Sequence, residues 1–365
     1  MGPPKTRDTP LAARRAGLRE RLASAGGSAL LVVHPPNICY LSGFRGGGAL
    51  LLTADGPDTL FVVPMNEAEA RGEVGEDVAV AVATRRPLET AREHLAGHEG
   101  VVAFEKDRLS VAQREAWESA GGSPLEGVSG WVEGLRVVKS IPERETIARA
   151  AGIAVDAFEA VLPEIRPGVT ELQLAARLER ELREQGSERF PFDTIVQFGE
   201  RAALPHAEPG GRPLARGEVA LFDFGAVVDG YVSDVSRTVS CGSPDPRLSE
   251  AYRVVDLARR AALDGLRGGI EARRADALAR DVIEERGYGP AFTHSLGHGI
   301  GLEVHEDPRL WKENGDPVPA GAVVTLEPGI YIQGLGGIRI EDDFVVGAAG
   351  ARALARPAPD ELVVL

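Results

Sequence analysis

A carboxylate inside an apolar run constrains the fold of this chain more than any other feature. Asp223 lies in the run VALFDFGAVV, residues 219–228. Burying an isolated carboxylate is costly, so Asp223 must be paired, protonated or bound to a metal ion. A structural aspartate that caps a nearby loop is the alternative, and Asp223 taken alone does not distinguish the two.

The dipeptide Asp229-Gly230, which follows this run, is typical of a tight β-hairpin. The register that such a turn sets places Asp223 opposite Ser236, with Asp234 two positions along on the same face. Diagonal neighbours of this kind have Cβ atoms about 7–8 Å apart. Two like charges at that spacing repel each other unless a cation lies between them. The hairpin therefore predicts a cation between Asp223 and Asp234, unless a bulge shifts the register.

A second hairpin that carries acidic residues is expected near the end of the sequence. Glu327 and Glu341 each follow a short apolar run, and the glycine-rich link 334–337 lies between them. A hairpin at this link sets Glu327 opposite Glu341. Two exposed glutamates at strand ends are the alternative, which the β-branched neighbours disfavour. The next two residues, Asp342 and Asp343, are expected to face solvent.

Four of the seven histidines lie in the last half of the chain: His206, His294, His298 and His305. His298 lies between two glycines, whose small size would let a metal or a substrate approach the backbone. A buried, hydrogen-bonded structural histidine is the alternative for any one of the four. All four together favour a functional site.

Four carboxylates and one imidazole form a hard, oxygen-rich ligand set. Four negative charges balance two divalent cations, and such a set favours Mn²⁺, with Co²⁺, Fe²⁺ or Zn²⁺ as alternatives. Two cations roughly 3.5–4 Å apart hold a bridging water as hydroxide near neutral pH and polarise a carbonyl oxygen. The residues therefore predict hydrolysis without a nucleophilic side chain.

The chain is long enough for two domains, since 365 residues exceed one ordinary domain. The first part alternates short β-type runs, one of them at 38–41, with helical patterns, which predicts a small α/β domain. Ser140 and Glu143 form a capping box that starts a long helix. The domains are therefore expected at 1–137 and 138–365. Strands with helices inserted between them predict an α+β fold for the second domain.

The balance of charges excludes some partners. Acidic side chains outnumber basic ones by 55 to 41, which gives a formal net charge of −14. Such a charge disfavours nucleic acid and anionic membranes. No run approaches the ~20 apolar residues of a membrane span, and the polar N-terminus lacks the apolar stretch of a signal peptide. Cys39 and Cys241 are expected to be reduced thiols, and a cytoplasmic location is expected.

Four segments of the second domain resemble a known family. They are DFGAVVDGYVSDVSRT, HSLGHGIGLEVHE, TLEPGIY and GIRIEDD, in this order. They resemble the pita-bread-fold dinuclear metallopeptidases, in particular the prolidases (Xaa-Pro dipeptidases) and the Xaa-Pro aminopeptidases. The resemblance is strong over residues 140–365 and consistent over the N-terminal domain. It implies a creatinase-like N-terminal α/β domain followed by an α+β pita-bread catalytic domain.

The resemblance also implies a role for each candidate residue. It matches five residues to the metal ligands of the family: Asp223, Asp234, His298, Glu327 and Glu341. His206 and His305 match two histidines that hold the substrate carbonyl and the tetrahedral intermediate, and His294 matches a further active-site histidine. Arg339 matches an arginine that hydrogen-bonds to a metal-binding carboxylate. Glu327 would also carry a proton to the leaving nitrogen.

The implied reaction removes the N-terminal residue from a peptide whose second residue is proline. The metal-bridging hydroxide attacks the Xaa-Pro carbonyl carbon, and the metal and His305 stabilise the oxyanion. We favour the Xaa-Pro aminopeptidase over the dipeptidase, although the two share every ligand. The alternatives are a non-catalytic pita-bread module that binds proteins and a creatinase-like amidinohydrolase. The intact ligand set argues against both.

The family usually forms dimers, so the resemblance also implies a homodimer. In such a dimer the N-terminal domain of one subunit can wall the active site of the other. The loop 43–46 contains glycines at both ends and is expected to protrude. Arg45 in this loop is the expected bidentate partner of a substrate carboxylate.

Overall fold

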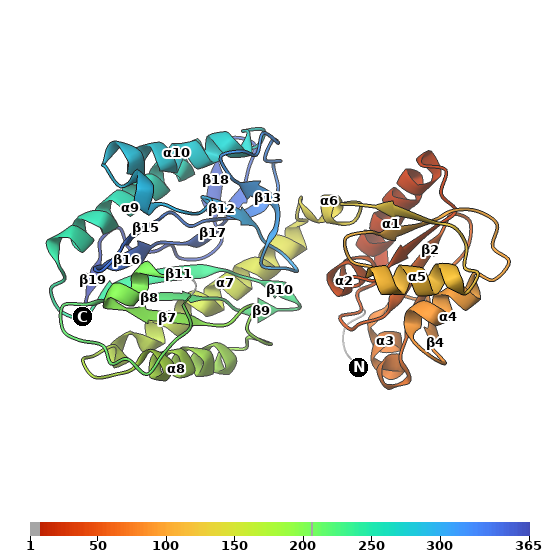
Figure 1. Cartoon of the computed structure of the whole chain (residues 1–365), viewed down its shortest axis with the longest axis horizontal. Helices are drawn as coiled ribbons and strands as arrows, with labels where there is room; N and C mark the ends of the chain where they lie inside the picture. Colours follow the sequence, from red (N-terminus) through yellow and green to blue (C-terminus); the bar gives the residue numbers. More distant parts are fainter. Residues whose placement is uncertain (1–7, 206) are drawn as a thin grey trace. The chain divides into compact units, whose positions relative to one another are not determined.

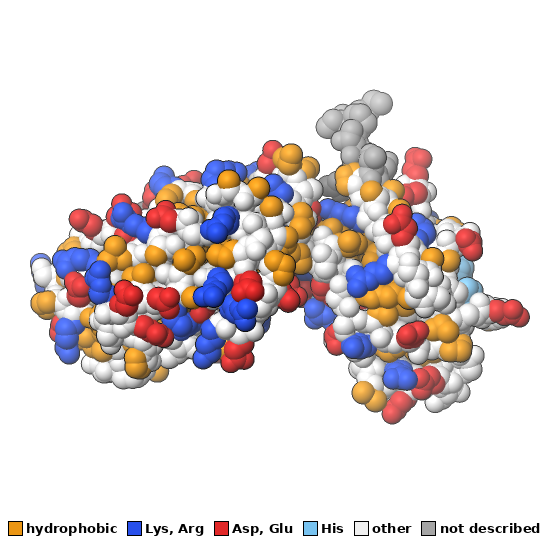
Figure 2. All heavy atoms as spheres, turned by 90° about the horizontal axis from the view of Figure 1, so that it is seen from above, with side chains coloured by type: hydrophobic (Ala, Val, Ile, Leu, Met, Phe, Trp, Pro, Cys, Tyr) orange, Lys and Arg blue, Asp and Glu red, His pale blue; other side chains and the backbone are white. Residues whose placement is uncertain are grey.

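The computed structural model of the chain describes residues 8–205 and 207–365. Its contacts divide the chain between Arg136 and Val137, one residue before the boundary expected from the sequence. On the surface that Figure 2 shows, Lys and Arg side chains are interspersed with Asp and Glu. Among the described residues, no helix is both long enough and apolar enough to cross a membrane.

The N-terminal unit contains a mixed six-stranded sheet (Figure 1). Its strands are β1 (Ala29–Val32), β2 (Ala49–Thr53), β3 (Asp58–Val62), β4 (Val78–Val82), β5 (Val102–Glu105) and β6 (Leu125–Val128). In the order β4-β3-β2-β1-β5-β6, β2 pairs antiparallel with both neighbours and the other pairs are parallel.

The helices of this unit are α1 (Asp8–Ser24), α2 (Pro35–Ser42), α3 (Glu67–Glu73), α4 (Pro87–His94), α5 (Val111–Ser119) and α6 (Glu133–Arg136), with a 3-10 turn η1 (Pro64–Asn66). Ala91 of α4 and Trp117 of α5 share one buried cluster with Leu31 and Leu51 of the sheet. Helices α4 and α5 therefore cover the same face. The expected α/β domain is confirmed.

Helix α2 replaces the strand that the sequence analysis expected at 38–41. Two prolines occupy its first turn, where a missing N–H costs nothing. Gly43 ends the helix with a φ of 84°, a left-handed conformation that favours glycine. Ile38 and Leu41 lie one turn apart and are both fully buried. The apolar residues follow helical spacing, so the expected strand is wrong.

The C-terminal unit begins with the helix that the capping box of Ser140 and Glu143 predicts. Its helices are α7 (Ile141–Val161), α8 (Glu171–Glu184), α9 (Pro246–Gly265) and α10 (Ala272–Glu285), with 3-10 turns η2 (Leu162–Glu164), η3 (Gly199–Ala203) and η4 (Gly289–Ala291). Its strands are β7 (Ile195–Phe198), β8 (Val219–Phe224), β9 (Val227–Val228), β10 (Tyr231–Val232), β11 (Val235–Ser240), β12 (Gly297–Gly299), β13 (Glu306–Leu310), β14 (Val323–Leu326), β15 (Gly329–Ile332), β16 (Gly336–Arg339), β17 (Asp342–Val346), β18 (Ala351–Ala353) and β19 (Val363–Val364).

These strands form two main sheets, β19-β11-β8-β7 and β13-β12-β14-β17-β18, and two ribbons, β10-β9 and β15-β16. Helices α7 and α8 pack against the first sheet, and α9 and α10 pack against the second (Figure 1). An isolated bridge between Ser236 and Glu341 joins the two sheets. The unit has the α+β fold expected from the sequence.

Both predicted hairpin registers are confirmed. Val228 pairs with Tyr231 and Asp223 with Ser236, as the Asp-Gly turn requires. In the second hairpin, Gly329 pairs with Arg339 and Leu326 with Asp342. These two pairs flank Glu327 and Glu341 and set them opposite each other.

Candidate metal centre

Side-chain alternation along β8 decides where Asp223 points. Phe222 and Phe224 both pack on Phe158 of α7, with ring centroids 5.2 and 5.6 Å apart. Neighbouring residues of a strand point to opposite faces. Asp223 therefore points away from α7, toward the face on which it meets Ser236 of β11.

Four further candidate ligands come from other strands and strand ends. His298 is the central residue of β12, Asp234 precedes β11, Glu327 follows β14, and Glu341 lies between β16 and β17. One ligand atom from each of Asp234, His298 and Glu341 lies within 4.8 Å of the other two. His298 Nε2 is 3.6 Å from Asp234 Oδ2 and 3.5 Å from Glu327 Oε1.

Arg339 links Asp223 to this group. Its Nη2 donates to Asp223 Oδ2 at 2.6 Å, and its Nε donates to Ser236 Oγ at 2.7 Å. Ser236 in turn donates to Glu341 Oε2 at 2.7 Å. One buried guanidinium thus orients two carboxylates, directly at Asp223 and through a hydroxyl at Glu341.

The hydrogen bond of His298 Nδ1 sets the tautomer of this ring. Nδ1 lies 3.0 Å from the carbonyl oxygen of Gly299, which can only accept, so Nδ1 carries the proton. Burial lowers the pKa of His298 to about 4, so the ring is neutral at pH 7. Nε2 then presents a lone pair to the carboxylates, as a metal ligand requires.

The two glycines around His298 allow the neighbouring strands to approach the backbone closely. A Cβ at Gly297 would lie 2.0 Å from the carbonyl oxygen of Thr325, and one at Gly299 would lie 2.1 Å from that of Asp307. The sequence analysis explained these glycines by the approach of a metal or substrate. The structure explains them by the close packing of β12 between its neighbours.

The carboxylates repel one another in a buried site. Burial and the charges of Glu341, Asp223 and Glu327 raise the pKa of Asp234 well above its ordinary value. Burial and the charge of Asp223 raise the pKa of Glu341 to about 8. Burial and the charge of Glu341 likewise raise the pKa of Glu327. A divalent cation would remove this repulsion.

Unpaired oxygens provide a separate test of whether the residues fit a metal. Asp223 Oδ1 and Asp234 Oδ1 are buried and have no hydrogen-bond partner among the described residues. Buried polar atoms of this kind call for a bound ion or water. Together with the lone pair of His298, they form a donor set that fits hard divalent cations.

Two further expected residues lie beside the ligands. The rings of His305 and His298 pack edge to face, with centroids 4.4 Å apart. His294 Nδ1 donates to the carbonyl of Ser295 at 2.8 Å, so Nε2 accepts from the Tyr331 hydroxyl at 2.9 Å. Arg339 also donates to Tyr331. Sequence reasoning missed Tyr331, although its place four residues after Glu327 in TLEPGIY was a usable signal.

Two expected substrate contacts differ in what the structure describes. His206 lies outside the described residues. Arg45 belongs to the N-terminal unit, where its Nε lies 3.7 Å from Glu73 Oε1. The adjacent Phe44 is fully buried, so the phenylalanine of this loop does not protrude as expected. The role of Arg45 stays a prediction.

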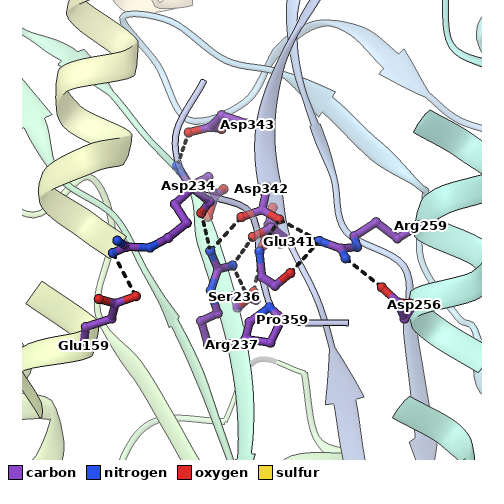
Figure 3. Close-up of polar contacts among 12 residues, drawn as sticks. Glu159, Asp234, Ser236, Arg237, Asp256, Arg259, Glu341, Asp342, Asp343 and Pro359 are labelled. Carbon is purple, nitrogen blue, oxygen red and sulfur yellow. Dashed lines mark hydrogen bonds and ion pairs between the residues drawn. The ribbon is translucent and has the colours of Figure 1, made fainter. Parts of the chain in front are cut away.

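The expectation that Asp342 and Asp343 face solvent is wrong (Figure 3). Asp342 is buried and accepts hydrogen bonds from Arg237 at 2.7 Å and Arg259 at 3.2 Å. Asp343 is also buried and accepts the N–H of Asp234 at 3.2 Å. Both arginines lie far from Asp342 in the sequence, so only the fold reveals the pairing.

Fold and site together define a class of protein. Two sheets bring buried carboxylates and a neutral imidazole together as a candidate metal site, with further histidines beside it, an arrangement typical of metal-dependent hydrolases. Residues 145–348 match the model of metallopeptidase family M24, and residues 14–138 match the creatinase/prolidase N-terminal domain. The chain belongs to metallopeptidase family M24 and is of the prolidase and Xaa-Pro aminopeptidase type.

Individual relatives agree over almost the whole chain. The Xaa-Pro dipeptidase of Pyrococcus furiosus is 34% identical over 328 residues, 90% of this chain and 93% of the relative. The structure of an Xaa-Pro dipeptidase from Bacillus anthracis has a TM-score of 0.93 at 34% identity and covers 97% of this chain and 100% of its own. The structure of the X-Pro aminopeptidase from Thermotoga maritima has a TM-score of 0.88 at 34% identity and covers 96% of this chain and 99% of its own. The expected family, fold and enzyme class are confirmed.

Proposed function

We propose that this metallopeptidase removes the N-terminal residue from peptides with proline in the second position, using two divalent metal ions. The observation that carries the proposal is the buried donor set, in which Asp223 Oδ1 and Asp234 Oδ1 find no partner among the described residues. Proline specificity is supported by relatives at 34% identity that are named Xaa-Pro dipeptidase and X-Pro aminopeptidase.

Five residues would hold the metal ions: Asp223, Asp234, His298, Glu327 and Glu341. When bound, the ions supply a hydroxide at neutral pH and polarise the scissile carbonyl. Oxygen donors dominate the set, so we propose Mn²⁺ as the native metal, with Co²⁺, Fe²⁺ and Zn²⁺ as alternatives.

The side chains of this chain orient the substrate and move protons. The Glu327 carboxylate takes the remaining proton of the attacking hydroxide and delivers it to the leaving proline nitrogen as the peptide bond breaks. His305 donates to the substrate carbonyl oxygen as negative charge develops there. The His294 ring, with Nδ1 3.7 Å from Glu327 Oε2, limits how far that carboxylate can turn. His206 is assigned to the substrate side together with His305.

Peptide cleavage tests the proposal. With Mn²⁺ we expect cleavage of Ala-Pro and Ala-Pro-Ala, none of Ala-Ala-Ala, and loss of activity on chelation. Equal cleavage of Ala-Ala-Ala would contradict the proline specificity. Elemental analysis of active protein should find two ions per chain, and a single ion would contradict the dinuclear site.

The same peptides decide between the two exopeptidases. Faster turnover of Ala-Pro-Ala than of Ala-Pro supports the aminopeptidase that we favour, and the reverse supports a dipeptidase. Hydrolysis of creatine in place of all three peptides would support the creatinase-like alternative. Sedimentation of the active protein tests the proposed homodimer.

A further inference from the structure

The turn that precedes β13 closes around a single buried carboxylate. In the hairpin of β12 and β13, Gly299 pairs with Glu306. Glu306 Oε1 accepts the backbone N–H groups of Leu302 at 2.8 Å and Glu303 at 3.2 Å. The Glu306 side chain is 6% exposed, so the turn encloses it. His305 is the last residue of this turn.

The turn fits its carboxylate closely. A Cβ atom at Gly301 would lie 2.7 and 2.8 Å from the two carboxylate oxygens of Glu306. Contacts this short are not tolerated, so Gly301 accepts no side chain while Glu306 keeps its place. The backbone at 301–303 is therefore shaped around this carboxylate.

Lys139 supplies the opposite charge from a fixed position. Its Nζ lies 3.0 Å from Glu306 Oε2, and its side chain is 1% exposed. The Lys139 N–H donates to the carbonyl of Gly321 at 3.0 Å, and the Lys139 carbonyl accepts from Arg144 at 2.7 Å. Burying an ion pair costs desolvation free energy. Apolar side chains in place of Lys139 and Glu306 would therefore give a hairpin that is no less stable. The charged pair therefore calls for a role beyond closure.

We propose that Lys139 and Glu306 are positioning residues for His305. The His305 ring contacts the His298 ring, so a small shift of the turn moves His305 relative to the metal centre. His298 is also anchored outside the turn, since its N–H donates to Thr325 Oγ1 of β14 at 3.1 Å. Loss of the Lys139 ammonium thus displaces His305 more than His298. The inference deepens the proposed function and rests on it for its kinetic test.

The kinetic test compares Lys139→Met, His305→Ala and the double variant, each loaded with Mn²⁺. Displacement of a catalytic group by about 1 Å can cost about a hundredfold, so we expect kcat of Lys139→Met on Ala-Pro-Ala to fall about ten- to hundredfold. Metal content stays at the parent value, and KM stays within about threefold. In the His305→Ala background, Lys139→Met lowers kcat no further, because the residue that it positions is gone. A fall of equal size in both backgrounds would overturn the proposal.

A second measurement does not depend on activity. Hydrogen exchange at the amides of Leu302 and Glu303 should rise at least tenfold in Lys139→Met, and unchanged exchange would overturn the proposal. Lys312→Met is the matched control, since Lys312 is exposed on the segment after β13 and lies over Trp311. It should leave kcat and exchange at parent values.

Two outcomes need separate treatment. If Lys139→Met yields no folded protein, Glu306→Gln takes its place, because it keeps an acceptor for both amides and loses the ionic contact to Lys139. We expect kcat to fall and hydrogen exchange at the two amides to rise in Glu306→Gln as well. If the parent protein cleaves none of the peptides, the proposed function fails, while the exchange measurement still decides whether Lys139 holds the turn.

Discussion

Without metal, the stability of the C-terminal unit should fall as the pH rises from 6.5 to 8. The pKa of Glu341 is raised from 4.5 to about 8 by burial and by the charge of Asp223. Folded, metal-free protein therefore keeps this proton in a range where the unfolded chain has lost it. Stability falls with pH wherever the folded state binds more protons, so the contribution of Glu341 is lost as the pH approaches 8.

The lower limit of this range follows from His298. Burial lowers its pKa from 6.5 to about 4, so the folded state binds fewer protons than the unfolded chain between those values. In that range the titration of His298 makes the stability rise with pH, which is opposite to the effect of the carboxylates. Above pH 6.5 the ring also loses its proton in the unfolded chain, so the contribution of His298 fades and that of the carboxylates prevails. Asp234 and Glu327, whose pKa values are also raised, act in the same direction as Glu341.

The size of the effect follows from the same shift. Between pH 6.5 and 8 the folded state keeps the Glu341 proton over about 1.5 pH units, and each unit corresponds to about 1.4 kcal/mol. The free energy of unfolding should therefore fall by an amount on the order of 2 kcal/mol. Once metal is bound, protons no longer occupy the site, and the affinity for metal rises with pH. The metal-loaded protein should therefore show no such loss.

Chemical denaturation of chelator-treated protein at four pH values between 6.5 and 8 measures the effect. Trp311 is the one tryptophan of the C-terminal unit, so replacing Trp117 and Trp131 by Phe makes its fluorescence report on that unit. Glu341→Gln is the matched control, and its slope should be smaller because the titrating group is gone. A free energy of unfolding that is constant or rises from pH 6.5 to 8 would refute the reasoning.

Three substitutions test the remaining assignments. Asp234→Asn should lose metal and activity together, because a neutral amide is a poor ligand; elemental analysis checks this, and a variant with full metal would contradict it. His305→Ala should keep its metals and lose roughly 10²–10³ in kcat on Ala-Pro-Ala; loss of metal would instead show that His298 is not the lone histidine ligand. Arg45→Ala should raise KM for Ala-Pro about tenfold to a hundredfold, since a charge-assisted contact contributes about 1.5–3 kcal/mol. It should leave Ala-Pro-Ala almost unchanged, and equal effects on both peptides would argue against the contact.

Local rules were sufficient where short segments decide the geometry. The turn Asp229-Gly230 sets the register that places Asp223 opposite Ser236. The capping box at Ser140 predicts the start of α7. In each case the deciding atoms are a few residues apart, so the sequence contains all that the prediction needs.

Local rules failed where the partner is distant in the sequence. Asp342 looks like an exposed loop residue because Arg237 and Arg259, which pair with it, come from β11 and α9. The prediction of a strand in place of α2 was wrong for a different reason. Its prolines mark a turn as readily as the start of a helix, and the left-handed conformation of Gly43, which ends the helix, is seen only in the structure. Long-range pairing is a property of the fold, and a short segment of sequence does not contain it.

The three consecutive carboxylates Glu341, Asp342 and Asp343 show how the fold separates like charges. Successive residues of a strand point to opposite faces, and Asp342 turns toward Arg237 and Arg259 while Asp343 reaches the N–H of Asp234. The arginines therefore neutralise Asp342 on one side of the strand and offer no countercharge to Glu341 on the other. Apart from Arg339, which already serves Asp223, the described residues leave that side with an excess of negative charge. The divalent metal ions that we propose would supply this countercharge, because Asp223 Oδ1 and Asp234 Oδ1 have no hydrogen-bond partner among the described residues and hard divalent cations bind several carboxylate oxygens.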